Sequence, residues 1–336
     1  MNRLRRLLPR LVLAVSWIAC PLLSAAHEVR PAYLQIRELP DGRYEVLWKQ
    51  PSQGELAVRL IPHIGGALLE GAPSSVESAP NFQIQTWREL DAGAAGLEGR
   101  TVRIEGLEQT ISDVLVSVAL LNGEQQQTIL RPGNPSFELH LGSRGLAVPA
   151  YLTLGVRHIL TGADHLCFVL ALLLLVPNRI MLVKTITAFT IAHSLTLAGT
   201  TLHLMAVQAD VIEPLVALSI VFVAVELAHF RRGRVGLTAR YPWLIAFTFG
   251  LLHGCAFAGA LAEVGLPADA IRLCLLLFNV GVEIGQLLFV AVALTMVWCL
   301  ARLERPLPAW TASIAPYGIG TFAVVWFLER VQGAIV

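Results

Sequence analysis

The chain changes its hydrophobic pattern once, near residue 146. Between residues 27 and 146, apolar and polar residues alternate in short runs, which is typical of half-buried β-strands. Pro40-Asp41-Gly42 and Asn122-Gly123 have the composition of hairpin turns. The predicted strands are 33–39, 44–50, 56–64, 82–90, 101–107, 113–121, 126–130 and 136–141. Seven or eight such strands predict a β-sandwich of immunoglobulin-like or jelly-roll type.

After Gly145 the alternation gives way to long apolar runs, each long enough to cross a bilayer as an α-helix. The predicted spans are 149–176, 180–205, 212–230, 242–264, 271–300 and 310–328. The sequence therefore predicts an α+β membrane protein. An all-β sandwich at 27–146 is followed by a six-helix transmembrane bundle at 147–336.

Residues 1–26 have the organisation of a cleavable secretory signal peptide. Four arginines precede an apolar stretch at 11–23, and the small residues Ser24-Ala25-Ala26 follow it. Cleavage there would leave His27 as an N-terminal residue able to chelate copper or nickel, although an ordinary exposed end is the simpler interpretation. Export predicts a bacterial inner-membrane protein with its β domain in the periplasm, where a partner protein could bind that domain.

The composition is typical of a membrane protein, and the net charge argues against a nucleic-acid partner. Hydrophobic residues make up 55% of the chain, charged residues 15%, and the mean hydropathy is +0.63. The net charge of +1 lacks the basic excess typical of nucleic-acid binding. Basic residues favour the loops predicted to be cytoplasmic, whereas the two predicted outer loops hold only Arg272. The cytoplasmic set is Arg179, Lys184, Arg231, Arg232, Arg234, Arg240, Arg302 and Arg305.

Ionisable and polar side chains recur inside the predicted spans, where burying a charge costs at least about 2.5 kcal/mol. Such residues are therefore candidates for function. They are His158, Asp164 and His165 on the first span, His193 and Ser194 on the second, Ser219, Glu226 and His229 on the third, His253 on the fourth, and Asn279, Glu283 and Gln286 on the fifth. We expect them to form an internal metal or proton site.

The first span carries the densest group. His158 and His165 are seven residues apart, about two helical turns, so both rings project to nearly the same side. Asp164 points elsewhere in a regular helix, unless Gly162 permits a kink that brings it in. Alternatively, Asp164 holds the tautomer of one histidine.

Two further spacings bear on the site. Glu226-x-x-His229 is a carboxylate–imidazole spacing used by metal sites in helical bundles, although His229 lies beside arginines and is equally suited to the membrane interface. On the fourth and fifth spans, Gly250/Gly254 and Gly281/Gly285 are pairs of small residues that allow close helix approach. We expect that approach to bring His253 and Glu283 within reach of one site.

The motif His158-x5-Asp164-His165 resembles one in the HupE/UreJ family of nickel permease-like membrane proteins, and Phe249-Gly-Leu-Leu-His253-Gly254 is similar to the family's second motif. The resemblance covers roughly residues 150–330. It is closest to the branch with an exported N-terminal domain, which also shows the patterns at 187–194 and 278–286. It implies nickel or cobalt as substrate. It also implies that His158, Asp164, His165 and His253 are functional residues. The second motif here lacks a histidine directly after the phenylalanine and a glutamate after the His-Gly pair.

The leading hypothesis is a secondary transporter or facilitator of a divalent transition metal, since imidazole and carboxylate ligands suit nickel, cobalt, zinc or copper. The predicted metal ligands are His158, Asp164, His165, His193, His253 and Glu283, and the supporting or proton-coupling positions are Glu226, His229, Asn279, Gln286 and Ser194. An alternative is a zinc-dependent intramembrane hydrolase that uses Ser194 beside the histidines. A metal sensor or assembly factor is a third hypothesis.

Overall fold

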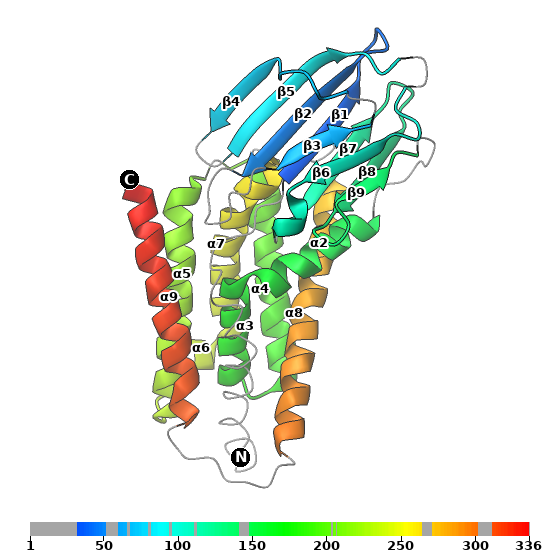
Figure 1. Cartoon of the computed structure of the whole chain (residues 1–336). Helices are drawn as coiled ribbons and strands as arrows, with labels where there is room; N and C mark the ends of the chain where they lie inside the picture. The colour runs from blue at the N-terminus through cyan, green and yellow to red at the C-terminus, as the bar shows by residue number, and fades with distance from the viewer. Residues whose placement is uncertain are drawn as a thin grey trace. The chain divides into compact units, whose positions relative to one another are not determined.

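The computed structural model describes residues 32–51, 60–65, 68–79, 82–93, 96–110, 113–140, 148–202, 204–205, 207–263, 271–301 and 311–335. The predicted signal peptide, His27 and residues 56–59 of the predicted strand at 56–64 lie outside these ranges. The described residues form two compact units, one from 32 to 151 and the other holding nearly all residues from 152 onward. Figure 1 labels their strands and helices.

The first unit is β-rich and contains two sheets. The larger has the strand order β4-β5-β2-β1-β7-β8, and the smaller has the order β3-β6-β9. The strands are β1 (Ala32–Glu38), β2 (Tyr44–Pro51), β3 (Ile61–Ile64), β4 (Ser75–Ala79), β5 (Phe82–Leu90), β6 (Thr101–Glu105), β7 (Val114–Ala119), β8 (Gln125–Leu130) and β9 (Ser136–Glu138). All pairings are antiparallel except β1 with β7, which is parallel.

The alternating pattern of these strands buries one hydrophobic core shared by the two sheets. In β2, Val46 and Trp48 are buried while their neighbours are half-buried, as a period of two requires. Val46 pairs with Ile36 of β1. The same cluster includes Val102 and Ile104 of the smaller sheet. Burial of this apolar surface, at about 25 cal/mol per Å², is the main stabilising contribution to the unit.

Both predicted hairpin turns are confirmed, and some predicted strand limits are wrong. Gly42 and Gly123 have φ of 76° and 82°, which favour glycine, and they link β1 to β2 and β7 to β8. The strand predicted at 101–107 ends at Glu105, because Gly106 has φ 85° and leads into the 3₁₀-helix η1 (Leu107–Gln109). The strand β4 was not predicted, since Ser75–Ala79 has few apolar residues.

The second unit is helical. Its helices are α2 (Val148–Thr161, which begins in the first unit), α3 (Ala163–Leu175), α4 (Arg179–Thr201), α5 (Ala209–Arg231), α6 (Leu237–Arg240), α7 (Pro242–Glu263), α8 (Ile271–Ala301) and α9 (Thr311–Ile335). Among the described residues, three segments are long and apolar enough to cross a membrane, namely Arg179–Thr201, Val211–Arg231 and Ile271–Met296. The bent pair Tyr151–Thr161 and Ala163–Leu175 makes a fourth if it is one span, and Pro242–Ala256 is a shorter apolar helix.

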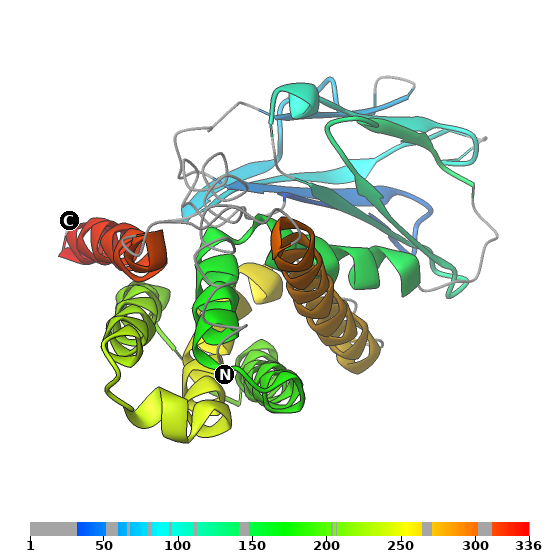
Figure 2. The same ribbon diagram turned by 90° about the horizontal axis from the view of Figure 1, so that it is seen from below.

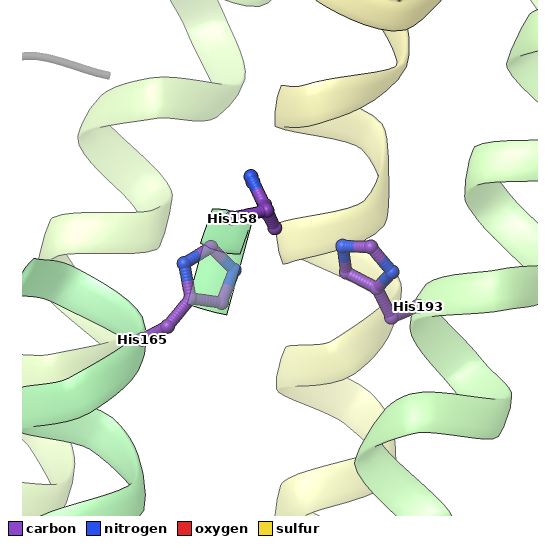
Figure 3. A group of neighbouring side chains, drawn as sticks. All are labelled: His158, His165 and His193. Atoms are coloured by element: carbon purple, nitrogen blue, oxygen red, sulfur yellow. The ribbon is translucent and has the colours of Figure 1, made fainter. Parts of the chain in front are cut away.

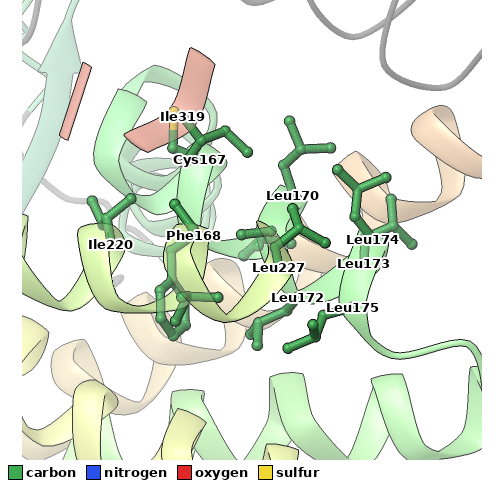
Figure 4. Packing of buried hydrophobic residues seen from close by; sticks show 14 of the residues in the cluster. Cys167, Phe168, Leu170, Leu172, Leu173, Leu174, Leu175, Ile220, Leu227 and Ile319 are labelled. Atoms are coloured by element: carbon green, nitrogen blue, oxygen red, sulfur yellow. The ribbon is translucent and has the colours of Figure 1, made fainter. Parts of the chain in front are cut away.

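Helix α3 forms the interior of the helical unit. Every residue from His165 to Leu175 is buried, as expected for a helix that is apolar on all sides. Figure 4 shows its side chains packed with Leu227 of α5 and Ile319 of α9. Helices α5 and α9 lie side by side, which is clear in the view of Figure 2, where α9 is red and α5 yellow-green. Two arginine hydrogen bonds link them: Arg232 to Tyr317 at 2.8 Å and Arg330 to the Glu213 carbonyl at 3.2 Å.

Candidate metal site

A break at Gly162 brings two histidines together. Helices α2 and α3 are bent by 71° at this residue, which has an extended backbone with φ −75° and ψ 98°. In an unbroken helix, residues seven apart are separated by about 10.5 Å along the axis. Across the break, the ring centroids of His158 and His165 are 4.8 Å apart. The single span predicted at 149–176 is therefore two helices, and their bend produces an approach that a straight helix does not allow.

Asp164 holds His165 in one orientation. Its Oδ1 accepts the backbone N–H of His165 at 2.8 Å and lies 3.0 Å from His165 Nδ1. Because an ionised carboxylate only accepts hydrogen bonds, this contact assigns the ring proton to Nδ1 and leaves a lone pair on Nε2. His165 Nε2 is buried and has no hydrogen-bond partner. Asp164 thus has the geometry of a carboxylate that orients a metal-binding imidazole.

His193 on α4 is oriented in the same way by an amide. Its side chain is fully buried, and its Nδ1 lies 3.4 Å from Asn279 Oδ1 on α8. The amide nitrogen of Asn279 donates to the Leu275 carbonyl at 2.8 Å, so the amide oxygen faces the ring. The network therefore assigns the ring proton of His193 to Nδ1. Its Nε2 is buried without a hydrogen-bond partner.

Three imidazoles from three helices form one group. Figure 3 shows His158, His165 and His193 pointing toward one another. One ring nitrogen from each lies within 4.8 Å of the others. Nitrogen ligands at about 2.0–2.1 Å from a tetrahedral metal are about 3.4 Å apart, so the rings have to draw in by roughly 1 Å to close on an ion. Side-chain rotation supplies a movement of this size.

A fourth histidine adjoins the group. The ring centroid of His253 on α7 is 5.1 Å from that of His165. Its Nε2 lies 3.3 Å from Ser219 Oγ, and that hydroxyl donates its one hydrogen to the Val216 carbonyl at 2.6 Å. Ser219 therefore accepts from His253 Nε2–H, which leaves a lone pair on Nδ1. This Nδ1 is buried and has no hydrogen-bond partner.

Both glycine pairs lie at close helix contacts, but α7 and α8 do not contact each other at these glycines, contrary to the prediction. A Cβ at Gly254 would clash with the His193 carbonyl, so Gly254 places α7 directly against α4. A Cβ at Gly281 would clash with the Leu152 carbonyl, so Gly281 places α8 against α2. The spacing of small residues predicts that a helix is closely approached but does not identify the partner.

Glu283 belongs to a separate polar cluster between α4 and α8. Its Oε1 accepts from Thr187 Oγ1 at 2.8 Å, and its Oε2 lies 2.5 Å from Thr190 Oγ1. Thr190 Oγ1 is also 2.9 Å from Gln286 Oε1. One hydroxyl hydrogen cannot serve two acceptors, so the cluster needs a second hydrogen. That hydrogen is either a proton on Glu283 or an N–H of Gln286 with its amide reversed.

Three further predicted positions are accounted for by local structure. Glu226 Oε2 accepts the Thr238 backbone N–H at 2.9 Å, so this carboxylate caps the short helix α6. Ser194 Oγ donates to the Thr190 carbonyl at 2.6 Å, a bond within its own helix. His229 is in the last turn of α5, next to the arginines. Within the described part of the chain, Glu226 and His229 are not members of the histidine group.

Arg330 was not among the predicted site residues. The last span was predicted to end at residue 328, which left Arg330 outside it, whereas α9 continues to Ile335. Arg330 Nη2 lies 3.3 Å from Asp164 Oδ2, and the two side chains are only 15% and 17% exposed. The apolar residues after Glu329 are the sequence feature that could have extended the helix. The carboxylate that orients His165 is therefore also paired with a cation.

The donor set of the group suits a transition metal. Imidazole nitrogens bind nickel, cobalt, copper and zinc, whereas magnesium and calcium prefer oxygen ligands. Buried polar nitrogens are rarely left without a partner, because each costs about 1–3 kcal/mol. His165 and His193 each present such a nitrogen within the group. A bound cation would satisfy both.

One of three comparisons with known proteins gives a match. The family model for HupE / UreJ proteins matches residues 138–330, more than half of the 336 residues. The match includes the histidine group, Asp164 and Arg330. No curated protein and no solved structure matches the chain. With its membrane-spanning helices and this match, the chain belongs to the HupE/UreJ family of membrane proteins.

Proposed function

We propose that this protein is a secondary transporter or facilitator that moves a divalent transition metal, nickel most readily, across the bacterial inner membrane. The single observation that carries the proposal is the convergence of His158, His165 and His193 from three helices. Two of their nitrogens are buried with no other partner. A charged ion crossing a bilayer needs such ligands in place of its water shell.

The choice of metal rests on ligand chemistry and on the family. Neutral imidazoles bind nickel and cobalt well, and copper binds them more tightly still. Membership in the family favours nickel, with cobalt as the next choice. Zinc and copper are competitors that the binding assay below has to include.

We further propose the membrane arrangement that transport requires. The helical unit crosses the membrane six times, with the β unit, a sandwich, in the periplasm. The excess of arginines in the predicted cytoplasmic loops supports this orientation. The bent pair α2 and α3 acts as one crossing, and a broken span with a binding site at the break is a common design in transporters.

Glu283 is the proposed site of ion coupling. Its carboxylate shares Thr190 with Gln286, and a proton on Oε2 would supply the second hydrogen that the cluster needs. A carboxylate that gains and loses one proton is suited to couple metal movement to a proton gradient. Glu283 lies on α8, the helix that also carries Asn279, whose amide oxygen faces His193.

The test is metal binding and uptake by the full-length protein. Cells that express it should accumulate nickel, and the purified protein should bind about one Ni²⁺ per chain in calorimetric titration, with Co²⁺, Zn²⁺ and Cu²⁺ as competitors. His165→Ala and His193→Ala should abolish uptake and strongly weaken binding, because each takes away a converging nitrogen. His229→Ala, which changes a histidine outside the group, should leave both intact. Equal loss in all three variants, or no metal bound by the wild type, would refute the proposal.

A further inference from the structure

Arg330, near the C-terminal end of α9, contacts the carboxylate that orients His165. Its Nη2 lies 3.3 Å from Asp164 Oδ2, and its Nη1 donates to the Glu213 carbonyl of α5 at 3.2 Å. Both members of the ion pair are largely buried, with 15% and 17% of their side chains exposed. A long cationic side chain is buried to this extent only where it has hydrogen-bond or ion-pair partners.

The two oxygens of Asp164 therefore serve two different partners. Oδ1 orients His165, whose other ring nitrogen faces the group, and Oδ2 pairs with Arg330. Asp164 is a carboxylate in contact with a histidine of the group. The positive charge of Arg330 offsets the negative charge of that carboxylate. A divalent ion entering the group then meets neutral imidazoles and a compensated carboxylate.

This compensation has a direct consequence for the strength of metal binding. A positive charge near the site repels an incoming cation and also withdraws the attraction of Asp164. A transport site has to bind its ion well enough to take it up and weakly enough to let it leave. Without the positive charge of Arg330, the full negative charge of Asp164 would attract the ion and favour its retention at the site.

We propose that Arg330 is a built-in counter-cation that lowers the affinity of the histidine group for metal and so permits release. It is a positioning residue, since it acts through Asp164 rather than by touching the ion. The inference rests on the proposed function, because it concerns how tightly the same group holds the metal.

A purely structural role for Arg330 makes the opposite prediction. If the guanidinium only clamps α9 and α5 to α3, then its loss loosens the site and weakens metal binding. If it is a counter-cation, its loss tightens binding. The sign of the affinity change separates the two roles, because damage to the fold does not strengthen a site.

The experiment uses the full-length protein in detergent or lipid nanodiscs, with Co²⁺ followed by its visible absorption and Ni²⁺ by calorimetry. Arg330→Met keeps the apolar stem and removes the charge, and it should bind either ion at least about tenfold more tightly than the wild type. Arg330→Lys keeps the charge and should stay close to the wild type. Arg232→Met is the matched control, because Arg232 also joins α5 to α9 but bonds Tyr317 instead of Asp164. It should leave the affinity unchanged.

Unchanged or weaker binding by Arg330→Met would overturn the inference, and so would equal tightening in Arg232→Met. A wild-type protein that binds neither ion is a different result, because it refutes the proposed function itself. Binding by the wild type without tightening in Arg330→Met removes only the counter-cation role. The two failures are therefore distinguishable in one titration series.

Discussion

Replacing Gly162 with alanine should damage metal binding while leaving the backbone at this residue unstrained. The extended conformation of Gly162 is open to any residue, so the cost comes from space alone. A Cβ here would lie 2.8 Å from both the His158 carbonyl oxygen and His165 Nδ1, and 3.3 Å from Asp164 Oδ1. Ordinary contacts of a Cβ begin at 3.4 Å, so the nearest two atoms have to retreat by about 0.6 Å.

That retreat is enough to break the contact that orients His165. The distance from His165 Nδ1 to Asp164 Oδ1 is 3.0 Å, and a lengthening to about 3.6 Å no longer leaves a hydrogen bond. Removing the partner that orients a metal-binding histidine typically costs about 10- to 100-fold in metal affinity. At about 1.4 kcal/mol per tenfold, this corresponds to about 1.4–2.8 kcal/mol.

The assay is Co²⁺ titration of purified Gly162→Ala, with folding checked by thermal melting. Gly318→Ala is the control, because a Cβ at Gly318 on α9 meets nothing within 4 Å. It should bind Co²⁺ like the wild type and gain slightly in stability, since alanine favours helix over glycine by up to about 1 kcal/mol. Wild-type affinity in Gly162→Ala would refute the reasoning that the break is packed around His165.

Three further predictions follow from particular contacts. Asn279→Leu removes the acceptor that orients His193 and should weaken Co²⁺ binding about 10- to 100-fold, and an unchanged affinity would show that the ring needs no such partner. Glu283→Gln keeps a neutral hydrogen-bonding group but releases no proton, so metal binding should persist while uptake becomes insensitive to protonophores, and retained sensitivity would exclude Glu283 as the coupling group. Gly281→Ala places a methyl against the Leu152 carbonyl and should lower the free energy of unfolding by about 1–3 kcal/mol; a melting temperature equal to that of the wild type would contradict the close α2–α8 crossing.

The sequence predicted the elements whose patterns depend on local chemistry. Strand β2 alternates buried and half-buried residues, and the hairpin glycines Gly42 and Gly123 supply the positive φ that their turns require. The apolar runs identified α4, α5 and α8 as long helices, because a continuous apolar segment has no other stable state in lipid. Strand β4 escaped because its residues are too polar to show a buried face.

The site was predicted in its residue types and only partly in its geometry. The motif singled out His158 and His165, which the structure brings together, but residue spacing does not fix the angle of a break at Gly162. Glu226 has the spacing of a ligand and yet caps α6, because it accepts a hydrogen bond from the backbone N–H of Thr238. Such outcomes depend on which helices become neighbours, and that is set by packing over the whole unit rather than by periodicity.

Arg330 illustrates the same limit from the other side. A lone arginine near the end of a last helix usually extends to the membrane interface, so nothing in its local sequence singles it out. Its role depends on a contact with Asp164, 166 residues earlier in the chain. The charge around the histidine group therefore depends on a distant segment, and a motif within one helix gives only part of it.

Metal transport as proposed requires His158, His165 and His193 to hold one metal ion together. X-ray absorption spectroscopy of the nickel-loaded protein measures this directly, through the number and distance of nitrogen ligands. We predict about three imidazole nitrogens at about 2.0–2.1 Å, and the loss of one of them in His193→Ala. A shell of oxygen ligands alone, or a nitrogen count that does not change in His193→Ala, would contradict the account.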